Sequence, residues 1–106
     1  MSQPGQGVPP YLVVYSGLCR DELKRLLARA RVKERVSEVA QAVQGIHTQL
    51  QWIPLDFGQP LKDYVNLNMI EYIGVCAPLV VKYSVDEARR IVYVTLPFDL
   101  LSRSGL

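Results

Sequence analysis

The stretch LNMIEYIGVCAPLVVKYSVDEARRIVYVTL, residues 67–96, decides the fold. Its apolar, aromatic and β-branched residues follow the two-residue period of β-strands. Two short breaks divide it, Ala77-Pro78 and Asp86–Arg89, and both have compositions typical of turns. We therefore predict strands at 67–76, 79–85 and 91–96, which form antiparallel pairs across these turns.

Upstream of this region the apolar residues follow a helical period. They recur at steps of three or four over residues 18–30, which predicts one face of a helix that Ser16 can cap. A second stripe covers residues 32–53 and ends before Pro54. The two stripes are out of phase near Arg31, so we expect two helices joined by a short turn. This hairpin must bury its apolar faces on something else, although the usual turn glycine or proline is missing.

The remaining segments complete the order of elements. The run Tyr11–Tyr15 predicts a short buried strand, and residues 54–66 are predicted to be a turn-rich connector. Residues 1–10 contain three prolines and two glycines and are predicted to be a flexible N-terminal tail, which leaves 11–106 as a single domain. The order β-α-α-β-β-β predicts an α+β fold, with a helical hairpin packed on an antiparallel sheet of about four strands.

The composition is that of one ordinary globular domain. The chain has 106 residues, of which 49% are hydrophobic and 21% charged, with a formal net charge of +2, and this excludes global disorder. Apolar runs stay well below the ~18 residues of a membrane span, and the first residues do not have the pattern of a signal peptide. The two cysteines form no CxxC pair, which indicates free thiols in a reducing compartment. We therefore expect a cytoplasmic protein with no membrane partner.

Several chemistries are excluded by residue types and spacing. A single histidine and two separate cysteines do not supply the ligands of a structural zinc site, so no metal is expected. The glycine-rich motifs of nucleotide-binding proteins and the nucleophile motif of α/β-hydrolases are missing, so no cofactor is expected. His47 lies between Ile46 and Leu50 in the second helical stripe and is interpreted as a hydrogen-bonded interior residue. Cys19 and Cys76 are interpreted as packing residues.

Positive charge is concentrated in the first helix. Residues 20–35 contain seven basic and three acidic side chains. Such a face is either simply solvated or meets phosphates or an acidic partner. The candidates for binding RNA or a partner are Lys24, Arg25 and Arg29 in this helix, Lys62 in the connector, Arg89 in the last turn and Arg103 near the end of the chain.

A lysine in the middle of a strand marks the second chemically interesting region. Lys82 alternates with apolar neighbours, so its face is open to solvent or to a ligand. Lys82 and Arg90 can supply charge to a phosphodiester, and Tyr83 can transfer a proton if a neighbour lowers its pKa. These three residues are the candidate catalytic set. The alternative interpretation is that Lys82 protects an edge strand from aggregation and that Arg90 is a solvated turn residue.

Three segments together resemble one known group of proteins. They are YLVVYSGLCRDELKRLL at residues 11–27, IPLDFGQPLKDY at residues 53–64 and PLVVKYSVDEARRIVYV at residues 78–94. In order and spacing they resemble the RelE/ParE superfamily of bacterial type II toxin–antitoxin pairs, from Tyr11 to about Leu96. The resemblance implies a small toxin domain neutralised by a co-encoded antitoxin. It also implies one of two targets, messenger RNA in the ribosomal A site for RelE-like members or DNA gyrase for ParE-like members.

The sequence departs from the RNA-cleaving branch at two places. Val80 stands where that branch usually has an arginine shortly before the tyrosine that resembles Tyr83. The stretch 97–101 lacks the His, Arg or Tyr that cleaving members tend to carry after the last strand. An endoribonuclease activity is therefore left open. So is the alternative of a non-toxic binding or regulatory module on the same fold, and the sequence also leaves a homodimer open.

Overall fold

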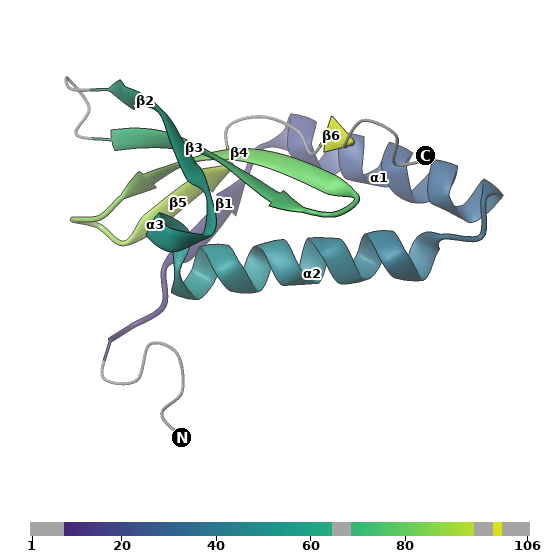
Figure 1. The fold of residues 1–106 in the computed structure, drawn as a ribbon, viewed down its shortest axis with the longest axis horizontal. Coiled ribbons are helices and arrows are strands. Elements are labelled where there is room, and N and C mark those ends of the chain that lie inside the picture. Colours follow the sequence, from purple (N-terminus) through teal and green to yellow (C-terminus); the bar gives the residue numbers. More distant parts are fainter. Residues whose placement is uncertain (1–7, 65–68, 95–98, 101–106) are drawn as a thin grey trace.

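The computed structural model describes residues 8–64, 69–94 and 99–100. Helices and strands follow in one series along the chain (Figure 1), namely β1 (Leu12–Tyr15), α1 (Gly17–Val32), α2 (Val36–Trp52), α3 (Pro54–Phe57), β2 (Gln59–Tyr64), β3 (Met69–Cys76), β4 (Leu79–Asp86), β5 (Ile91–Val94) and β6 (Asp99–Leu100). The helical hairpin and the three late strands were predicted from the sequence, and the α+β fold class is confirmed.

The sheet is mixed rather than wholly antiparallel. Its strand order is β1-β5-β4-β3-β2, and β6 pairs with β4. The pairs β3–β4 and β4–β5 are antiparallel, as predicted, and β2, which was not predicted, is antiparallel to β3. In contrast, β1 runs parallel to β5, with Leu12 beside Ile91 and Tyr15 beside Val94. Because β1 and β4 flank β5 on both sides, β5 is an interior strand. This position explains why its sequence is apolar on both faces.

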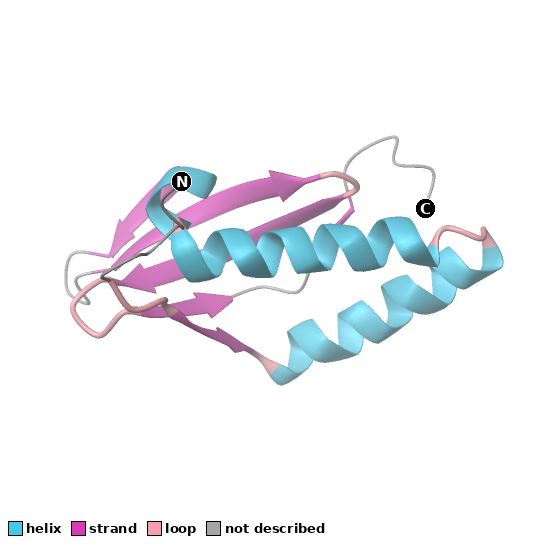
Figure 2. Ribbon diagram, turned by 90° about the horizontal axis from the view of Figure 1, so that it is seen from below, coloured by secondary structure: helices cyan, strands magenta, loops and turns pink. Residues whose placement is uncertain are grey.

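Both helices lie on one side of the sheet, where they form a hairpin (Figure 2). The Ser16 hydroxyl accepts a hydrogen bond from the Cys19 amide at 3.1 Å, which confirms the predicted cap at the start of α1. The turn between the helices needs no glycine because Glu34 adopts the left-handed conformation, with φ of 56°. The Arg35 amide then bonds to the Ala30 carbonyl at 2.7 Å and closes the turn.

The core lies between the helices and one face of the sheet. Along β4, Leu79, Val81, Tyr83 and Val85 face the helices and are buried, as the alternation predicted. They pack against the inner stripes of the two helices, which consist of Cys19, Leu26 and Ala30 in α1 and Val39, Ala42, Ile46 and Leu50 in α2. The opposite face of the sheet carries no described helix.

The prediction of a turn-rich connector at residues 54–66 is wrong for most of that segment. Pro54 opens α3, since a proline at a first helical position lacks only an amide that has no partner there. The chain then enters β2, which forms an edge of the sheet. Pro60 is tolerated because the strand is an edge and because its register with β3 shifts between Pro60 and Lys62. Prolines and a glycine therefore indicated a loop where an irregular edge strand forms.

Other predictions fall wholly or partly outside the described residues. The flexible tail was predicted at 1–10, of which only 8–10 are described, and the single domain at 11–106 includes gaps at 65–68, 95–98 and 101–106. The predicted strand 91–96 is described as far as Val94. Within the described part of the chain, no helix is long and apolar enough to cross a membrane.

Candidate functional site: a groove between the two helices

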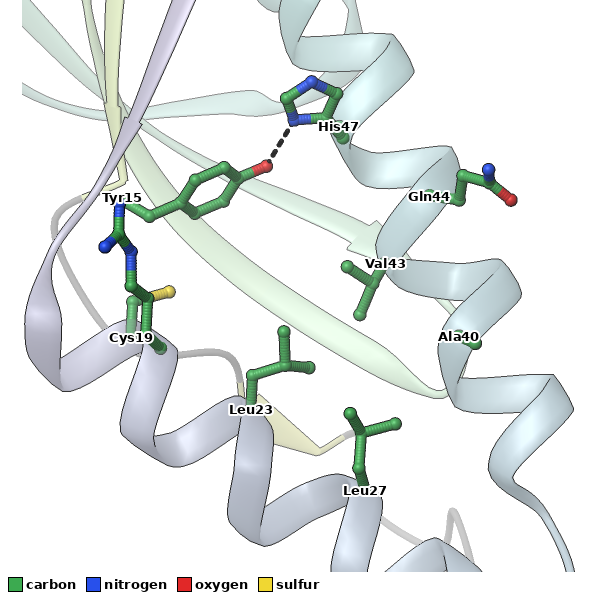
Figure 3. Close-up of a pocket in the computed structure, with 9 residues that line it drawn as sticks. Tyr15, Cys19, Leu23, Leu27, Ala40, Val43, Gln44 and His47 are labelled. Carbon is green, nitrogen blue, oxygen red and sulfur yellow. Dashed lines mark hydrogen bonds between the residues drawn. The ribbon is translucent and has the colours of Figure 1, made fainter.

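An open apolar groove runs between α1 and α2 (Figure 3) and has a volume of about 550 Å³. In the close-up, Leu23 and Leu27 of α1 face Val43 of α2 across the gap, and Tyr15 of β1 reaches in beside them. The residues that line the groove are Tyr15, Cys19, Arg20, Leu23, Leu27, Ala40, Val43, Gln44 and His47. We refer to this surface as the α1–α2 groove.

The groove exists because each helix has two neighbouring apolar stripes. In α1 the inner stripe of Cys19, Leu26 and Ala30 is buried against the sheet. Leu23 and Leu27 are turned away from the centre of this stripe by about 40–80°, since successive residues are about 100° apart around a helix. They are only half-buried. The apolar surface of the hairpin is thus wider than the sheet can cover.

One end of the groove carries a polar pair. The Tyr15 hydroxyl and His47 Nδ1 are 2.8 Å apart in a hydrogen bond, and the two rings stack with centroids 5.9 Å apart. Burial, with a smaller effect of neighbouring Cys19, raises the pKa of Tyr15 to about 12. Its hydroxyl therefore keeps its proton at neutral pH and is able to donate to the imidazole.

The interpretation of His47 as an interior residue is wrong. It is exposed, at the open side of the hairpin. The error came from treating residues 32–53 as one stripe, whereas Ile46 and Leu50 belong to the inner stripe and His47 and Val43 to the groove. The signal was available in the sequence, because a stripe that includes His47 as well as Ile46 and Leu50 is too broad for one buried face.

The three candidate catalytic residues lie apart. Lys82 is half-buried on the face of β4 that points away from the helices, whereas Tyr83 points to the opposite face and is fully buried. The Tyr83 hydroxyl donates to the Pro54 carbonyl at 2.6 Å and accepts from the Gly58 amide at 2.8 Å. Burial raises the pKa of Tyr83 above its ordinary value. This tyrosine holds α3 to the sheet, and its pKa is shifted away from the range useful for proton transfer.

Arg90 has a structural position at the turn between β4 and β5. Its guanidinium donates from Nε and Nη2 to the Pro9 carbonyl, at 3.0 and 2.6 Å, and lies 4.1 Å from the centroid of the Tyr11 ring. Lys82 is four residues before Asp86, where β4 ends, so about 13 Å of strand separates it from this turn. Arg90 thus fixes the segment that leads into β1.

The predicted binding residues are spread over several surfaces. Lys24, Arg25 and Arg29 are exposed on α1, where Arg25 pairs with Glu22 at 3.4 Å and Lys24 lies about 100° around the helix from Arg25. Arg89 is exposed in the last turn, 3.8 Å from Asp86. The side chain of Lys62 and all of Arg103 lie outside the described residues. The described candidates therefore form no single cluster. Among the residues that the structure describes, no three or more potential metal ligands lie close enough together to hold a metal ion.

The sheet face that points away from the helices is a second, more ordinary surface. Leu12 and Val14 of β1 and Val75 of β3 are exposed there, with exposed fractions of 62%, 40% and 53%. Lys82 lies between them on β4, as the alternation predicted. Ser84, the next residue of β4 on the same face, is buried, with an exposed fraction of 3%. This face therefore combines apolar strands with a lysine.

Comparison with known proteins supports the fold. Neither a protein-family model nor a curated protein matches the chain. Among solved structures, the chain is similar to a protein in the crystal structure of the toxin–antitoxin complex RelBE2 from Mycobacterium tuberculosis. The TM-score is 0.64 and the identity 21%, over 89% of this chain and 94% of the other. At this identity the similarity shows the fold alone, and the chain has a RelE-like α+β fold, as the sequence resemblance implied.

Proposed function

We propose that this protein is the toxin-like member of a type II toxin–antitoxin pair and is neutralised by a co-encoded antitoxin in the cytoplasm. The observation that carries the proposal is the similarity of nearly the whole chain to a protein of a toxin–antitoxin complex. The order and spacing of the three sequence segments support it independently, because they depend on residue types and not on the shape of the fold.

The target is either ribosome-bound messenger RNA or DNA gyrase. RNA cleavage through attack by a 2′-hydroxyl needs a base and cations that meet at one phosphate. Tyr83 and Arg90 are engaged in structural contacts, and Lys82 points to the other face from Tyr83. Among the described candidates, Lys82 is therefore the one that we propose for contact with a nucleic acid or a target protein on the open sheet face.

Growth provides the first test. The chain is expressed from an inducible promoter alone and together with the product of the adjacent reading frame. Growth arrest that the neighbour relieves supports the proposal. Normal growth at full expression contradicts it and leaves the second candidate function, a non-toxic binding module on the same fold. The lack of convergence among Lys82, Tyr83 and Arg90 favours that candidate.

The target is identified in two purified reactions. Messenger ends are mapped by primer extension in cell-free translation, with and without ribosomes, and DNA supercoiling by gyrase is measured in parallel. Ribosome-dependent cuts that Lys82→Ala removes and Lys82→Arg retains assign the RNA target. Lys82→Arg is the matched control because it keeps the positive charge at the same position of β4. Gyrase inhibition with intact messenger assigns the other target.

A further inference from the structure

Strand β1 is held in the sheet by few buried side chains. None of its four residues is buried, whereas β3, β4 and β5 each contain buried residues. It lies at one end of the strand order, and in the described part of the sheet it pairs with β5 alone. Because segments with few buried apolar contacts open most easily, the position of β1 depends on contacts at its two ends.

Arg90 connects the start of β1 to the turn before β5. Its guanidinium donates to the Pro9 carbonyl from Nε at 3.0 Å and from Nη2 at 2.6 Å, and it lies 4.1 Å from the centroid of the Tyr11 ring. The Arg90 carbonyl accepts a hydrogen bond from the Leu12 amide at 2.9 Å, and the Tyr11 amide donates to the Gln51 carbonyl of α2 at 2.8 Å. This arginine therefore contacts three of the residues from Pro9 to Leu12.

The backbone at Arg90 indicates that this side chain has a specific role. Arg90 adopts the left-handed conformation, with φ of 55°, which glycine adopts without cost and other residues adopt at a cost. A backbone in such a conformation persists where the surrounding contacts determine it. The contacts that arginine adds at this position, and that glycine would lack, are those of the guanidinium with Pro9 and Tyr11.

The other end of β1 is held by a second contact. The Tyr15 hydroxyl is hydrogen-bonded to His47 Nδ1 at 2.8 Å, and the two rings are stacked. About 10 Å of extended chain separates Tyr15 from Leu12 at the start of the strand. Tyr15 also lines the α1–α2 groove, so the position of β1 decides whether the polar end of the groove is complete.

We propose that residues 8–15, which we call the β1 strap, are a releasable unit of the fold that Arg90 holds at its start and the Tyr15–His47 hydrogen bond holds at its end. The strap opens as one unit, while the helices and the strands β2 to β5 stay folded. Opening removes Tyr15 from the groove, so Arg90 controls from the opposite end of β1 how often the groove is complete.

Native-state hydrogen exchange tests the start of the strap. The amides of Tyr11 and Leu12 report its opening, because their acceptors belong to two different parts of the fold, α2 and the turn before β5. In the wild type we expect both amides to give the same opening equilibrium constant, larger than that of the β4 amides. Arg90→Ala keeps a non-glycine residue in the left-handed conformation and removes only the guanidinium. We expect this variant to raise the opening constant of both amides about tenfold.

Two further variants separate the guanidinium contact from other effects at this turn. Arg89→Ala is the matched control, since Arg89 is exposed in the same turn and pairs with Asp86. We expect it to leave the opening constant within about twofold of wild type. Arg90→Lys keeps the charge but not the contact through two nitrogens, and its opening constant is expected to lie between those of wild type and Arg90→Ala.

Tyr15→Phe tests the other end of the strap, because it keeps the ring and removes only the hydroxyl. If the strap opens as one unit, this loss reaches Tyr11 and Leu12, whose opening constant we expect to rise about twofold. In the variant that combines Tyr15→Phe with Arg90→Ala the two effects multiply, to about 20-fold. Thr48→Val is the control, since it removes a hydroxyl that donates to the Gln44 carbonyl within α2, and no change at the strap is expected.

Four results would overturn the proposal. Unchanged exchange in Arg90→Ala would mean that the guanidinium does not hold the strap. An equal increase at the β4 amides would mean that the whole fold, and not the strap, has become less stable. Different opening constants at Tyr11 and Leu12, or no response of these amides to Tyr15→Phe, would mean that the two ends of β1 open separately.

Discussion

The two sides of the helical hairpin have similar apolar residues but differ in how deeply these residues are buried. On the side toward the sheet, only 2% of Leu26 is exposed, and the Tyr83 hydroxyl forms hydrogen bonds with two backbone groups. Toward the groove, Leu27 is half-buried and the Tyr15 hydroxyl bonds to an exposed histidine. The comparison shows that apolar periodicity in the sequence indicates how wide the apolar surface of a helix is. Which part of that surface becomes buried depends on the elements that pack against it.

The largest expected difference is between two consecutive leucines. Leu26→Ala leaves a cavity in the core and is expected to lower the free energy of unfolding by about 3 kcal/mol. Leu27→Ala removes a side chain that is already partly in water, so we expect a loss of about 1 kcal/mol. Urea denaturation of both variants measures the pair. Equal losses would mean that the groove is as closely packed as the core.

Two tyrosines give the second comparison. Tyr83→Phe leaves the Pro54 carbonyl and the Gly58 amide without their hydroxyl partner in a buried place, and we expect a loss of about 2 kcal/mol. Tyr15→Phe breaks a bond to an exposed imidazole that water can replace, with an expected loss of about 0.5 kcal/mol. Thermal unfolding reports both. A larger loss of stability for Tyr15→Phe than for Tyr83→Phe would contradict the conclusion that Tyr83 is on the buried side of the hairpin and Tyr15 on the open side.

The turn that joins the helices offers a smaller, stabilising change. Glu34 is in the left-handed conformation, which costs a non-glycine residue about 1 kcal/mol. Glu34→Gly is therefore expected to raise the free energy of unfolding by up to about 1 kcal/mol. Lys33→Gly is the control, because Lys33 has φ of −97° and gains nothing from glycine, so that variant is expected to be slightly less stable than wild type. Denaturation in urea distinguishes them.

The smallest expected effect is that of alkaline pH on stability, through the buried hydroxyl of Tyr83. Burial raises the pKa of Tyr83, so the folded state keeps this proton at a pH where the unfolded chain loses it. Its contribution to stability is complete below about pH 10, the ordinary tyrosine value, and is lost as the pH rises through the folded pKa. We expect the free energy of unfolding to fall less steeply above about pH 10 in Tyr83→Phe than in wild type. Parallel slopes, measured by urea titration at several pH values, would contradict this.

Much of the fold could be predicted from the apolar periodicity and from the residues that start or end helices. The change of period after residue 66, the Ser16 cap and Pro54 placed the helices and the three late strands within a few residues. The strand β2 was missed because its prolines and glycine have the composition of a loop, and pairing with β3 overrides that local preference. The parallel pairing of β1 with β5 was missed because partner and direction of a short strand depend on distant residues.

The candidate site was less predictable than the fold. Sequence reasoning chose Lys82, Tyr83 and Arg90 for their chemistry, but residue types do not reveal that Tyr83 faces the core or that Arg90 reaches Pro9. The α1–α2 groove depends on how far apart two helices lie, which no stripe on a single helix specifies. Its lining residues were recognised as apolar, and their exposure became visible only in the assembled hairpin.

The pairing of β1 with β5 has a consequence for how the chain folds. Leu12 lies beside Ile91, so β1 has its strand partner only when β5 is available. Contacts between residues so distant in sequence slow folding, because a long loop must close before they stabilise anything. During synthesis the hairpin and β1 leave the ribosome well before residues 91–94. The groove between the helices, whose polar end is anchored on β1, is therefore completed late, once nearly the whole described chain has been made.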